Sequence, residues 1–237
     1  MEKTLRDSNH STRDELVTEF EKANIPTDNN RASHLFMAAE LDEIICSGAK
    51  KGGKLTYALL EERVPRTQAL TRDEALAKLA KKYFASHAPA TIQDFAWWSG
   101  LSLRDANQAV ESVKSGLRSE TVNSQTYWFT GLEFKPGNSV YFLPAFDEFI
   151  ISYTDRTASL SMNEHSKAVS SNGIFWPVVL LNGQVLGTWS RTFKKSKVLV
   201  ETKLFEQPEA ATITLIEAAA LNFGHFLVKE IEIKHIS

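Results

Sequence analysis

The sequence predicts an α+β fold: a tandem winged helix, meaning two helix-turn-helix modules with β-wings, followed by a β-rich C-terminal unit with one long helix. Three observations support this prediction. Residues 1–64 follow the order helix, helix, hairpin. The same order returns in residues 71–143, where three helices carry capping signals. In residues 144–237, short aromatic and β-branched runs replace the helical spacing until Pro208 opens a long helix.

The first module is predicted from a capping box and two apolar stripes. Thr12 and Glu15 have the spacing of a capping box, and the helix that they open ends at the break Asn24-Ile25-Pro26. A second helix follows over residues 31–41, and the apolar runs 44–46 and 55–59 flank a basic, glycine-containing tip that predicts a hairpin. A winged helix usually has one more helix in front, and only residues 1–8 are left to supply it. We therefore expect this module to be shortened.

The second module is more complete, because three helix starts follow one another. Hydroxyl caps with an acidic residue three places on occur as Thr71 with Glu74, Thr91 with Asp94, and Ser102 with Asp105. Gly100 supplies a turn between the second and third helices, and residues 121–129 predict a wing. Residues 63–70 contain Pro65 and no clear period, so we expect a linker there.

The C-terminal unit is predicted from its turns. Asn182-Gly183 joins the apolar runs 176–181 and 184–189, which is typical of a type I′ hairpin. A third strand over residues 197–205, a helix from Pro208 to about residue 229 and a strand over residues 231–236 complete the unit. Residues 159–173 are polar, and we expect them to form a mobile loop.

Composition excludes several classes of protein. The chain has 237 residues, of which 43% are hydrophobic, so it is long and apolar enough to bury a core. Its single cysteine, Cys46, excludes an intramolecular disulfide and any zinc site built on several cysteines. The histidines are too scattered to predict a metal site, and no cofactor is predicted. Because no uninterrupted apolar run has the length of a membrane span and the N-terminus lacks a signal peptide, we expect a cytoplasmic protein with no membrane contact.

Charge is unevenly distributed along the chain. The formal net charge of −2 opposes nucleic-acid binding, which depends on lysines and arginines that replace counterions on phosphates. Residues 47–82, however, hold nine basic and four acidic side chains, and a second basic cluster lies on the hairpin predicted around residues 191–197. Such patches can bind DNA from an otherwise acidic protein, although a solvated face explains them equally well.

Eleven residues on the predicted reading helices, wings and hairpin are the candidates for contact with double-stranded DNA. Asparagine, glutamine and arginine read base edges, while lysine at a wing tip needs only charge and reach to contact phosphate. The candidates are Arg31, His34, Lys50, Lys51, Lys54, Arg104, Asn107, Gln108, Arg191, Lys194 and Lys195. Trp97 and Trp98 are adjacent on a helix, so at least one is expected to pack in the core. Asp147 and Arg156 are expected to form an ion pair.

Three segments resemble a bacterial family of winged-helix DNA-binding proteins. They are DFAWWSGLSLRD at residues 94–105, LPAFDEFIISYTDR at residues 143–156 and NGQVLGTWSR at residues 182–191, and their order and spacing match as well. Some members of that family are DNA glycosylases that excise alkylated bases and unhook interstrand crosslinks. The resemblance covers nearly the whole chain, and it implies tandem winged helices with a β-rich C-terminal part that bind DNA.

The resemblance also predicts what the chain lacks. The family's glycosylases carry a glutamine, one apolar residue, and then glutamine or aspartate in an N-terminal winged helix, and this sequence contains no such triplet. We therefore expect the N-terminal catalytic domain to be absent, assign no catalytic residue and do not predict glycosylase activity for this chain. Two alternatives to a DNA-binding protein stay open: a glycosylase that is degenerate or completed by a further segment, and a winged-helix module for protein–protein contact.

Overall fold

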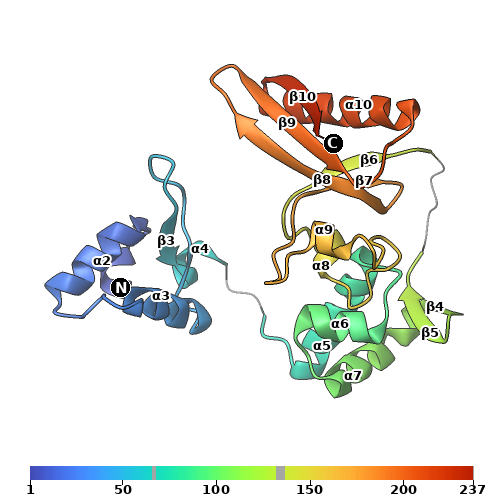
Figure 1. Cartoon of the computed structure of the whole chain (residues 1–237). Coiled ribbons are helices and arrows are strands. Elements are labelled where there is room, and N and C mark those ends of the chain that lie inside the picture. Colours follow the sequence, from blue (N-terminus) through green and yellow to red (C-terminus); the bar gives the residue numbers. More distant parts are fainter. Residues whose placement is uncertain (66–67, 132–136, 237) are drawn as a thin grey trace. The chain divides into compact units, whose positions relative to one another are not determined.

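The computed structural model describes residues 1–65, 68–131 and 137–236, and the chain divides into two compact units, residues 1–69 and 70–237 (Figure 1). The division falls inside the linker expected at residues 63–70, of which residues 66–67 lie outside the described part. The further boundary expected after residue 143 stays a prediction.

The first unit contains the expected hairpin and, before its two longer helices, a short front helix. Its elements are α1 (Glu2–Leu5), β1 (Ser11–Thr12), α2 (Arg13–Lys22), α3 (Arg31–Leu41), β2 (Ile45–Ser47), β3 (Thr56–Leu59) and α4 (Leu60–Arg63). The strands form a sheet in the order β1-β3-β2. The front helix is present as the single turn α1, and it contributes Leu5, which is fully buried. Leu5 attaches this turn to the core. The module is thus shortened as expected, but it keeps a front helix of one turn.

The core of the first unit is built around Phe36 of α3. Its ring lies 5.7 Å from that of Phe20 on α2 and stacks at 4.7 Å on Tyr57 of β3. The capping box at Thr12 is confirmed, because the hydroxyl of Thr12 accepts from the backbone nitrogen of Glu15. Aromatic side chains from three elements therefore hold α3 at a fixed angle to the hairpin.

The second unit begins with three helices and a two-stranded ribbon. These elements are α5 (Arg72–Ser86), α6 (Ile92–Ser99), α7 (Leu103–Val113), the 3₁₀ turn η1 (Lys114–Gly116), β4 (Arg118–Val122) and β5 (Gln125–Phe129). All three predicted caps are confirmed, since the hydroxyls of Thr71, Thr91 and Ser102 each accept from the backbone nitrogen three residues on. Gly100 adopts φ +71°, a left-handed conformation that glycine accommodates without strain.

The two adjacent tryptophans have different environments, as their spacing predicted. Trp98 packs against Tyr83 with ring centroids 5.1 Å apart, inside the core of the three helices. Trp97 is 60% exposed, and its indole N–H donates to the carbonyl of Ile151 at 2.9 Å. Both side chains are thus used in packing.

The C-terminal part of the second unit is a five-stranded sheet in the order β10-β9-β8-β7-β6 (Figure 1). Its strands are β6 (Val140–Leu143), β7 (Val178–Leu181), β8 (Gln184–Phe193), β9 (Lys197–Leu204) and β10 (Glu230–Ile236). The predicted Asn182-Gly183 hairpin is confirmed, with φ of +51° and +85° at these two residues. β10 pairs parallel with β9, and the connection between them is α10 (Ala210–Leu227).

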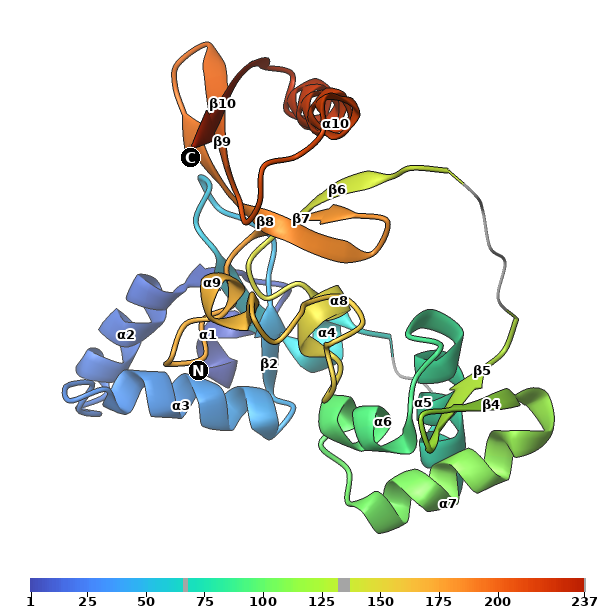
Figure 2. The ribbon, with the colours of Figure 1, turned by 45° about the vertical axis from the view of Figure 1, so that its right-hand side comes forward.

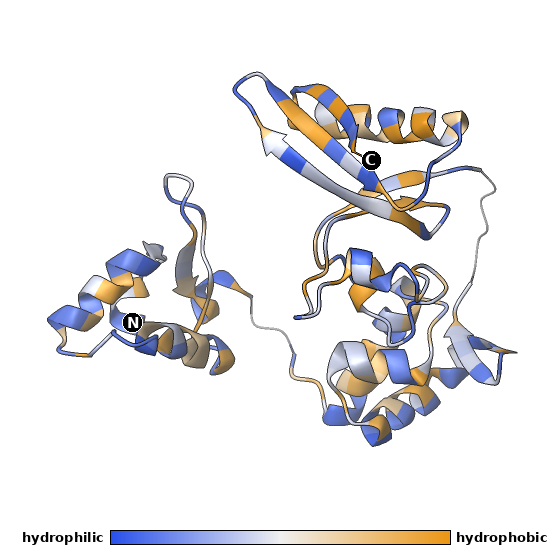
Figure 3. Cartoon of the chain, viewed as in Figure 1, coloured by the Kyte–Doolittle hydropathy of each residue, from blue (hydrophilic) through white to orange (hydrophobic). Residues whose placement is uncertain are grey.

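The two faces of this sheet carry different layers, which follows from the alternation of side chains along a strand. Val179 and Val198 pack with Ile216 of α10 on one face. Val178 and Leu180 face the opposite layer, which contains α8 (Glu148–Ile151) and α9 (His165–Ala168) (Figure 2). Figure 3 shows hydrophobic residues running along β9 and α10.

The expectation of a mobile loop over residues 159–173 is wrong for the middle of that segment. This segment contains α9, and Leu160, Ala168 and Val169 are buried beneath the sheet. Isolated apolar residues at irregular spacing gave no periodic signal, yet tertiary packing orders them.

The segment after β6 ties the sheet to the three-helix part. The hydroxyl of Tyr153 donates to the carbonyl of His87 at 2.9 Å, and the ring of His87 contacts the carboxylate of Glu148 at 2.9 Å. The expected ion pair between Asp147 and Arg156 is wrong. Asp147 instead caps α8, and the Nε of Arg156 donates to the carbonyl of Ile150 at 2.7 Å. Both side chains satisfy backbone groups of the same short helix.

One helix of the described residues, α10, is long and apolar enough to cross a membrane by length and composition. In the structure 17% of this helix is buried, and its buried residues Ile216, Ala220 and Gly224 lie on the side that packs on the sheet.

Candidate nucleic-acid interface

The face of α3 that the first core leaves exposed carries the two residues predicted there. Arg31 and His34 are exposed, while Ala32 and Phe36 on the other side of the helix are buried. The exposed face is not purely polar, since Met37 lies on it. Sequence reasoning missed Arg13, whose guanidinium lies 5.0 Å above the ring of Phe36 and donates to the hydroxyl of Ser33 at 2.9 Å. The sequence does show that Arg13 is the first residue of the helix that Thr12 caps, and this was the signal that could have marked it.

The lysines of the first wing are partly neutralised by α2. The ammonium of Lys51 contacts the carboxylate of Glu15 at 2.6 Å, and that of Lys54 contacts Asp14 at 3.3 Å. Lys50 is exposed, and no partner is recorded for its side chain in the described residues. Of the three lysines predicted to contact phosphate, only Lys50 therefore offers a charge that is not shared with an acidic neighbour.

Glu15 has two roles that both favour its charged form. The Lys51 ammonium beside it and the hydrogen bond that it accepts from the Thr12 backbone lower its pKa to about 2. Glu15 is consequently ionised at every physiological pH, so the pair with Lys51 does not depend on pH in that range.

In the second unit, the candidate residues on the polar side of α7 differ in whether their side chains form hydrogen bonds within the chain. Arg104 is exposed, and no hydrogen bond of its side chain is recorded in the described part of the chain. Asn107 uses one amide hydrogen to donate to the carbonyl of Leu103 at 2.6 Å. The amide of Gln108 donates to the carboxylate of Asp73 at 2.9 Å. Gln108 therefore supports the contact between α7 and α5.

A salt bridge also joins α5 and α7, in addition to the hydrogen bond between Gln108 and Asp73. Arg72 contacts Asp105 at 2.9 Å, and this guanidinium, with the Ser102 hydroxyl, holds the pKa of the Asp105 carboxyl below its usual value. The negative charge of Asp105, which follows the candidate contact Arg104 in the sequence, is thus offset by Arg72.

The basic hairpin β8–β9 also has internal partners. Lys194 contacts Glu232 of β10 at 3.4 Å, and Lys197 forms an ion pair with the same carboxylate. The guanidinium of Arg191 lies 5.5 Å above the ring of Trp189. Lys195 is exposed, and its carbonyl accepts a hydrogen bond from Lys229 at 3.1 Å. Among the described residues, no carboxylate neutralises the charges of Arg191 and Lys195 on this hairpin.

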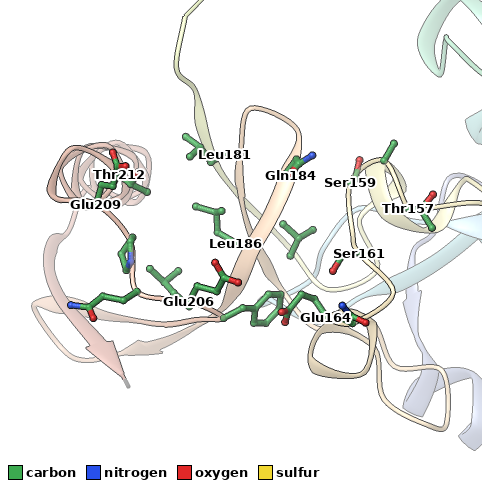
Figure 4. Close-up of a pocket in the computed structure, with 17 residues that line it drawn as sticks. Thr157, Ser159, Ser161, Glu164, Leu181, Gln184, Leu186, Glu206, Glu209 and Thr212 are labelled. Carbon is green, nitrogen blue, oxygen red and sulfur yellow. The ribbon is translucent and has the colours of Figure 1, made fainter.

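A cavity of about 500 Å³ lies between the sheet and the chain around residues 157–164 (Figure 4). Of the described residues that line it, three are acidic, Glu164, Glu206 and Glu209, and none is a lysine, arginine or histidine. Lys167 contacts Glu164 at 2.8 Å. A lining of this charge repels phosphate, which separates the cavity from the candidate DNA surfaces.

Metal binding finds no support in the part of the chain that the structure describes. No group of three or more histidine, cysteine or carboxylate side chains is close enough to hold an ion there.

Two of three comparisons with known proteins gave a match. A family model described as DNA glycosylase AlkZ-like matches residues 2–226. The DNA glycosylase AlkZ of Streptomyces sahachiroi is similar in structure, with a TM-score of 0.77 and 20% sequence identity, over 99% of this chain and 67% of that chain. A search of curated proteins gave no match. At this identity the structural likeness shows the fold, and the match of the family model over most of the chain shows the family.

Proposed function

The chain belongs to the AlkZ-like DNA glycosylase family, and from that premise we propose that it binds double-stranded DNA through two winged-helix modules. In the first module α3 is the reading helix and β2–β3 the wing. In the second these elements are α7 and β4–β5. The hairpin β8–β9 provides a further basic contact. The proposed contact residues are Arg31, His34, Lys50, Lys51, Lys54, Arg104, Asn107, Gln108, Arg191, Lys194 and Lys195.

One observation carries the proposal: in each module the helix that precedes the hairpin leaves its polar side exposed. Arg31 and His34 lie on that side of α3, and Arg104 and Asn107 lie on that side of α7. A helix that docks in the major groove needs such a face, and the hairpin after it reaches the adjacent phosphates.

Salt dependence distinguishes this proposal from a module for protein–protein contact. Binding of a fluorescent duplex, measured by anisotropy at increasing salt concentration, should weaken steeply, because each phosphate contact contributes a slope of about −0.9 in log K against log salt. A slope near zero, or no binding at low salt, contradicts the proposal.

Single substitutions identify the contact surfaces. Lys50→Ala and Arg104→Ala should each weaken binding and reduce the salt slope by about one. Lys22→Ala is the matched control, because Lys22 is an exposed lysine at the end of α2 that pairs with Glu19 at 2.6 Å. A loss of affinity for Lys22→Ala equal to that of Lys50→Ala would mean that only overall charge matters.

Family membership supports a second candidate function, excision of an alkylated or crosslinked base. The test is release of the base from damaged duplex under single-turnover conditions, with the intact chain in excess. Release of the base would establish catalysis by this chain, and the glutamine and acidic residues near the bound lesion would then be the first to substitute. Binding without release supports the DNA-binding role alone.

A further inference from the structure

A neutral polar cavity opens beside the reading helix of the second module. It measures about 500 Å³ and lies where the start of α6, the middle of α7, the turn of the β4–β5 wing and Thr154 meet. Gln93, Asn107 and Gln125 contribute side-chain amides to it, and Trp128 contributes an aromatic ring. Among the described residues that line it, none is acidic or basic and none is a histidine. This cavity is therefore chemically unlike the acidic one beneath the sheet.

The three amides keep hydrogen-bonding capacity that the fold does not use. Asn107 spends one N–H on the Leu103 carbonyl at 2.6 Å, which leaves its other N–H and its carbonyl. The carbonyl of Gln125 accepts weakly from the Tyr127 hydroxyl at 3.3 Å, which leaves both of its N–H groups. No partner is recorded for the amide of Gln93 in the described residues. A carboxamide donates and accepts side by side, which is the pattern that a nucleobase edge also presents.

The aromatic wall is held in place by the backbone. Trp128 exchanges two hydrogen bonds with Ala90, at 3.2 Å and 2.8 Å, so β5 is fixed to the chain before α6. The ammonium of Lys114 lies 5.7 Å from the centre of the Trp128 ring. The indole is half-buried, which leaves part of its surface available for stacking.

The remaining wall is equally well fixed. Thr154 donates to the buried carboxylate of Asp94, and the other oxygen of that carboxylate accepts from Thr91. Both oxygens of Asp94 accept hydrogen bonds from these threonines, so its negative charge is compensated by protein donors. The walls are thus positioned before any ligand arrives, which lowers the entropic loss on binding.

We propose that this cavity accepts an unpaired nucleobase of DNA bound to the second module. The described lining holds no cationic side chain, which disfavours phosphate as the main ligand, whereas amides around an indole suit a neutral, planar ring with donors and acceptors on its edge. Asn107 and the wing turn belong to the surface proposed to face the duplex, so a base that leaves the stack is within reach of the opening. This inference rests on the proposed DNA binding and adds the part of the DNA that is recognised.

The test compares three duplexes that differ only at one position. One is fully paired, one carries a single bulged nucleotide, and one carries an abasic residue in that bulge. The intact protein should bind the bulged nucleotide about tenfold more tightly than the abasic bulge, because only the former offers a base to stack and to hydrogen-bond. Equal affinity for the two bulges, with normal binding of the paired duplex, overturns the inference alone. Failure to bind any duplex overturns the proposed function as well.

Variants locate the effect in the cavity. Gln93→Ala should reduce the ratio of the two bulge affinities toward one. Gln207→Ala, which removes a glutamine from the lining of the acidic cavity, should keep the wild-type ratio. Trp128→Leu should lose the preference and Trp128→Phe should retain it, with circular dichroism confirming that both variants are folded. An unchanged ratio in both Gln93→Ala and Trp128→Leu contradicts the assignment.

Titration with free nucleosides tests whether the ligand of the cavity is a base within DNA or a small molecule. Titration with thymidine or deoxyadenosine should give binding far weaker than that of the bulged duplex, since the duplex contacts hold the base near the opening. Binding of a free nucleoside as tight as that of the bulged duplex would show that the ligand is a small molecule and would overturn the assignment to DNA.

Discussion

Thr154 donates two hydrogen bonds to one carboxylate oxygen of Asp94, from its backbone nitrogen at 2.8 Å and from its hydroxyl at 2.7 Å. The other oxygen accepts from the backbone nitrogen and the hydroxyl of Thr91, at 3.0 Å and 2.7 Å. Asp94 is 4% exposed, so this carboxylate has exchanged water for four protein donors. It completes the capping box of α6 and at the same time fixes the chain that follows α8.

Replacing Asp94 should therefore destabilise the second unit strongly. Asp94→Ala leaves the buried donors of Thr91 and the donors of Thr154 without this carboxylate, and we expect a loss of about 2–4 kcal/mol in the free energy of unfolding, measured by urea denaturation with tryptophan fluorescence. Thr154→Val removes only the hydroxyl bond and should lose about 1 kcal/mol. Asp28→Ala, at an exposed position in the first unit, is the control. A loss below 1 kcal/mol for Asp94→Ala would show that water replaces the carboxylate.

Glu15→Gln should strengthen the binding of duplex DNA. The substitution removes a negative charge beside the first wing and releases Lys51 from its 2.6 Å contact, so the lysine becomes available to phosphate. We expect affinity to rise severalfold at low salt and the salt slope to steepen by up to one. Glu19→Gln, which releases Lys22 at the other end of α2, should have a smaller effect. Unchanged or weaker binding of Glu15→Gln would mean that the first wing does not touch DNA.

The same carboxyl predicts how the first unit responds to acid. Because the folded-state pKa of Glu15 is lowered from 4.5 to about 2, the folded state is favoured above the unfolded value, and this contribution is lost as the pH falls from about 4.5 to 2. The protection of the α2 amides, meaning their exchange rate relative to the intrinsic rate at each pH, should therefore decrease over that window. In Glu15→Gln this protection should change less with pH. A parallel pH dependence in both proteins would assign the acid response to other groups.

Val228→Gly should stabilise the end of α10 and the second unit of which it is part. Val228 ends α10 in the left-handed conformation, with φ +53° and ψ +47°, and is 91% exposed. A β-branched residue is strained there by about 1 kcal/mol and this one buries little in return, whereas glycine is the preferred residue at such a helix end. Thermal unfolding should show a higher midpoint for Val228→Gly and a lower one for Val228→Pro. A lower midpoint for the glycine variant would mean that Val228 has a packing role in solution.

Gly187→Ala should disrupt the pairing of β8 with β9. A Cβ at this position would lie 2.3 Å from the backbone oxygen of Lys203, and strand backbone cannot move away without breaking the ladder. We expect a loss of about 2 kcal/mol or more in the free energy of unfolding. Gly116→Ala is the matched control, since a Cβ there meets nothing within 4 Å. Equal stability of the two variants would contradict the close approach of the strands.

Local structure could be predicted from the sequence because its signals lie within a few residues of one another. The caps at Thr12, Thr71 and Thr91 each bond to the residue three places on, and the Asn182-Gly183 turn requires only its own two positive φ angles. The family could be predicted for a similar reason, since its motifs are short strings in a fixed order. The sequence also marked Asn107 as a candidate contact, because its place on the polar side of a helix follows from spacing alone.

Tertiary structure decided what these side chains are available to do. Lys51 meets Glu15 across 36 positions, Gln108 meets Asp73 across 35, and Thr154 meets Asp94 across 60. Partners so far apart in the chain leave no periodic trace, because which of many carboxylates a lysine or an amide reaches depends on how whole helices pack. The sequence by itself determined where helices and turns begin and which residues carry charge. Packing determined which of those charges remain unpaired, and it created the cavity beside α7.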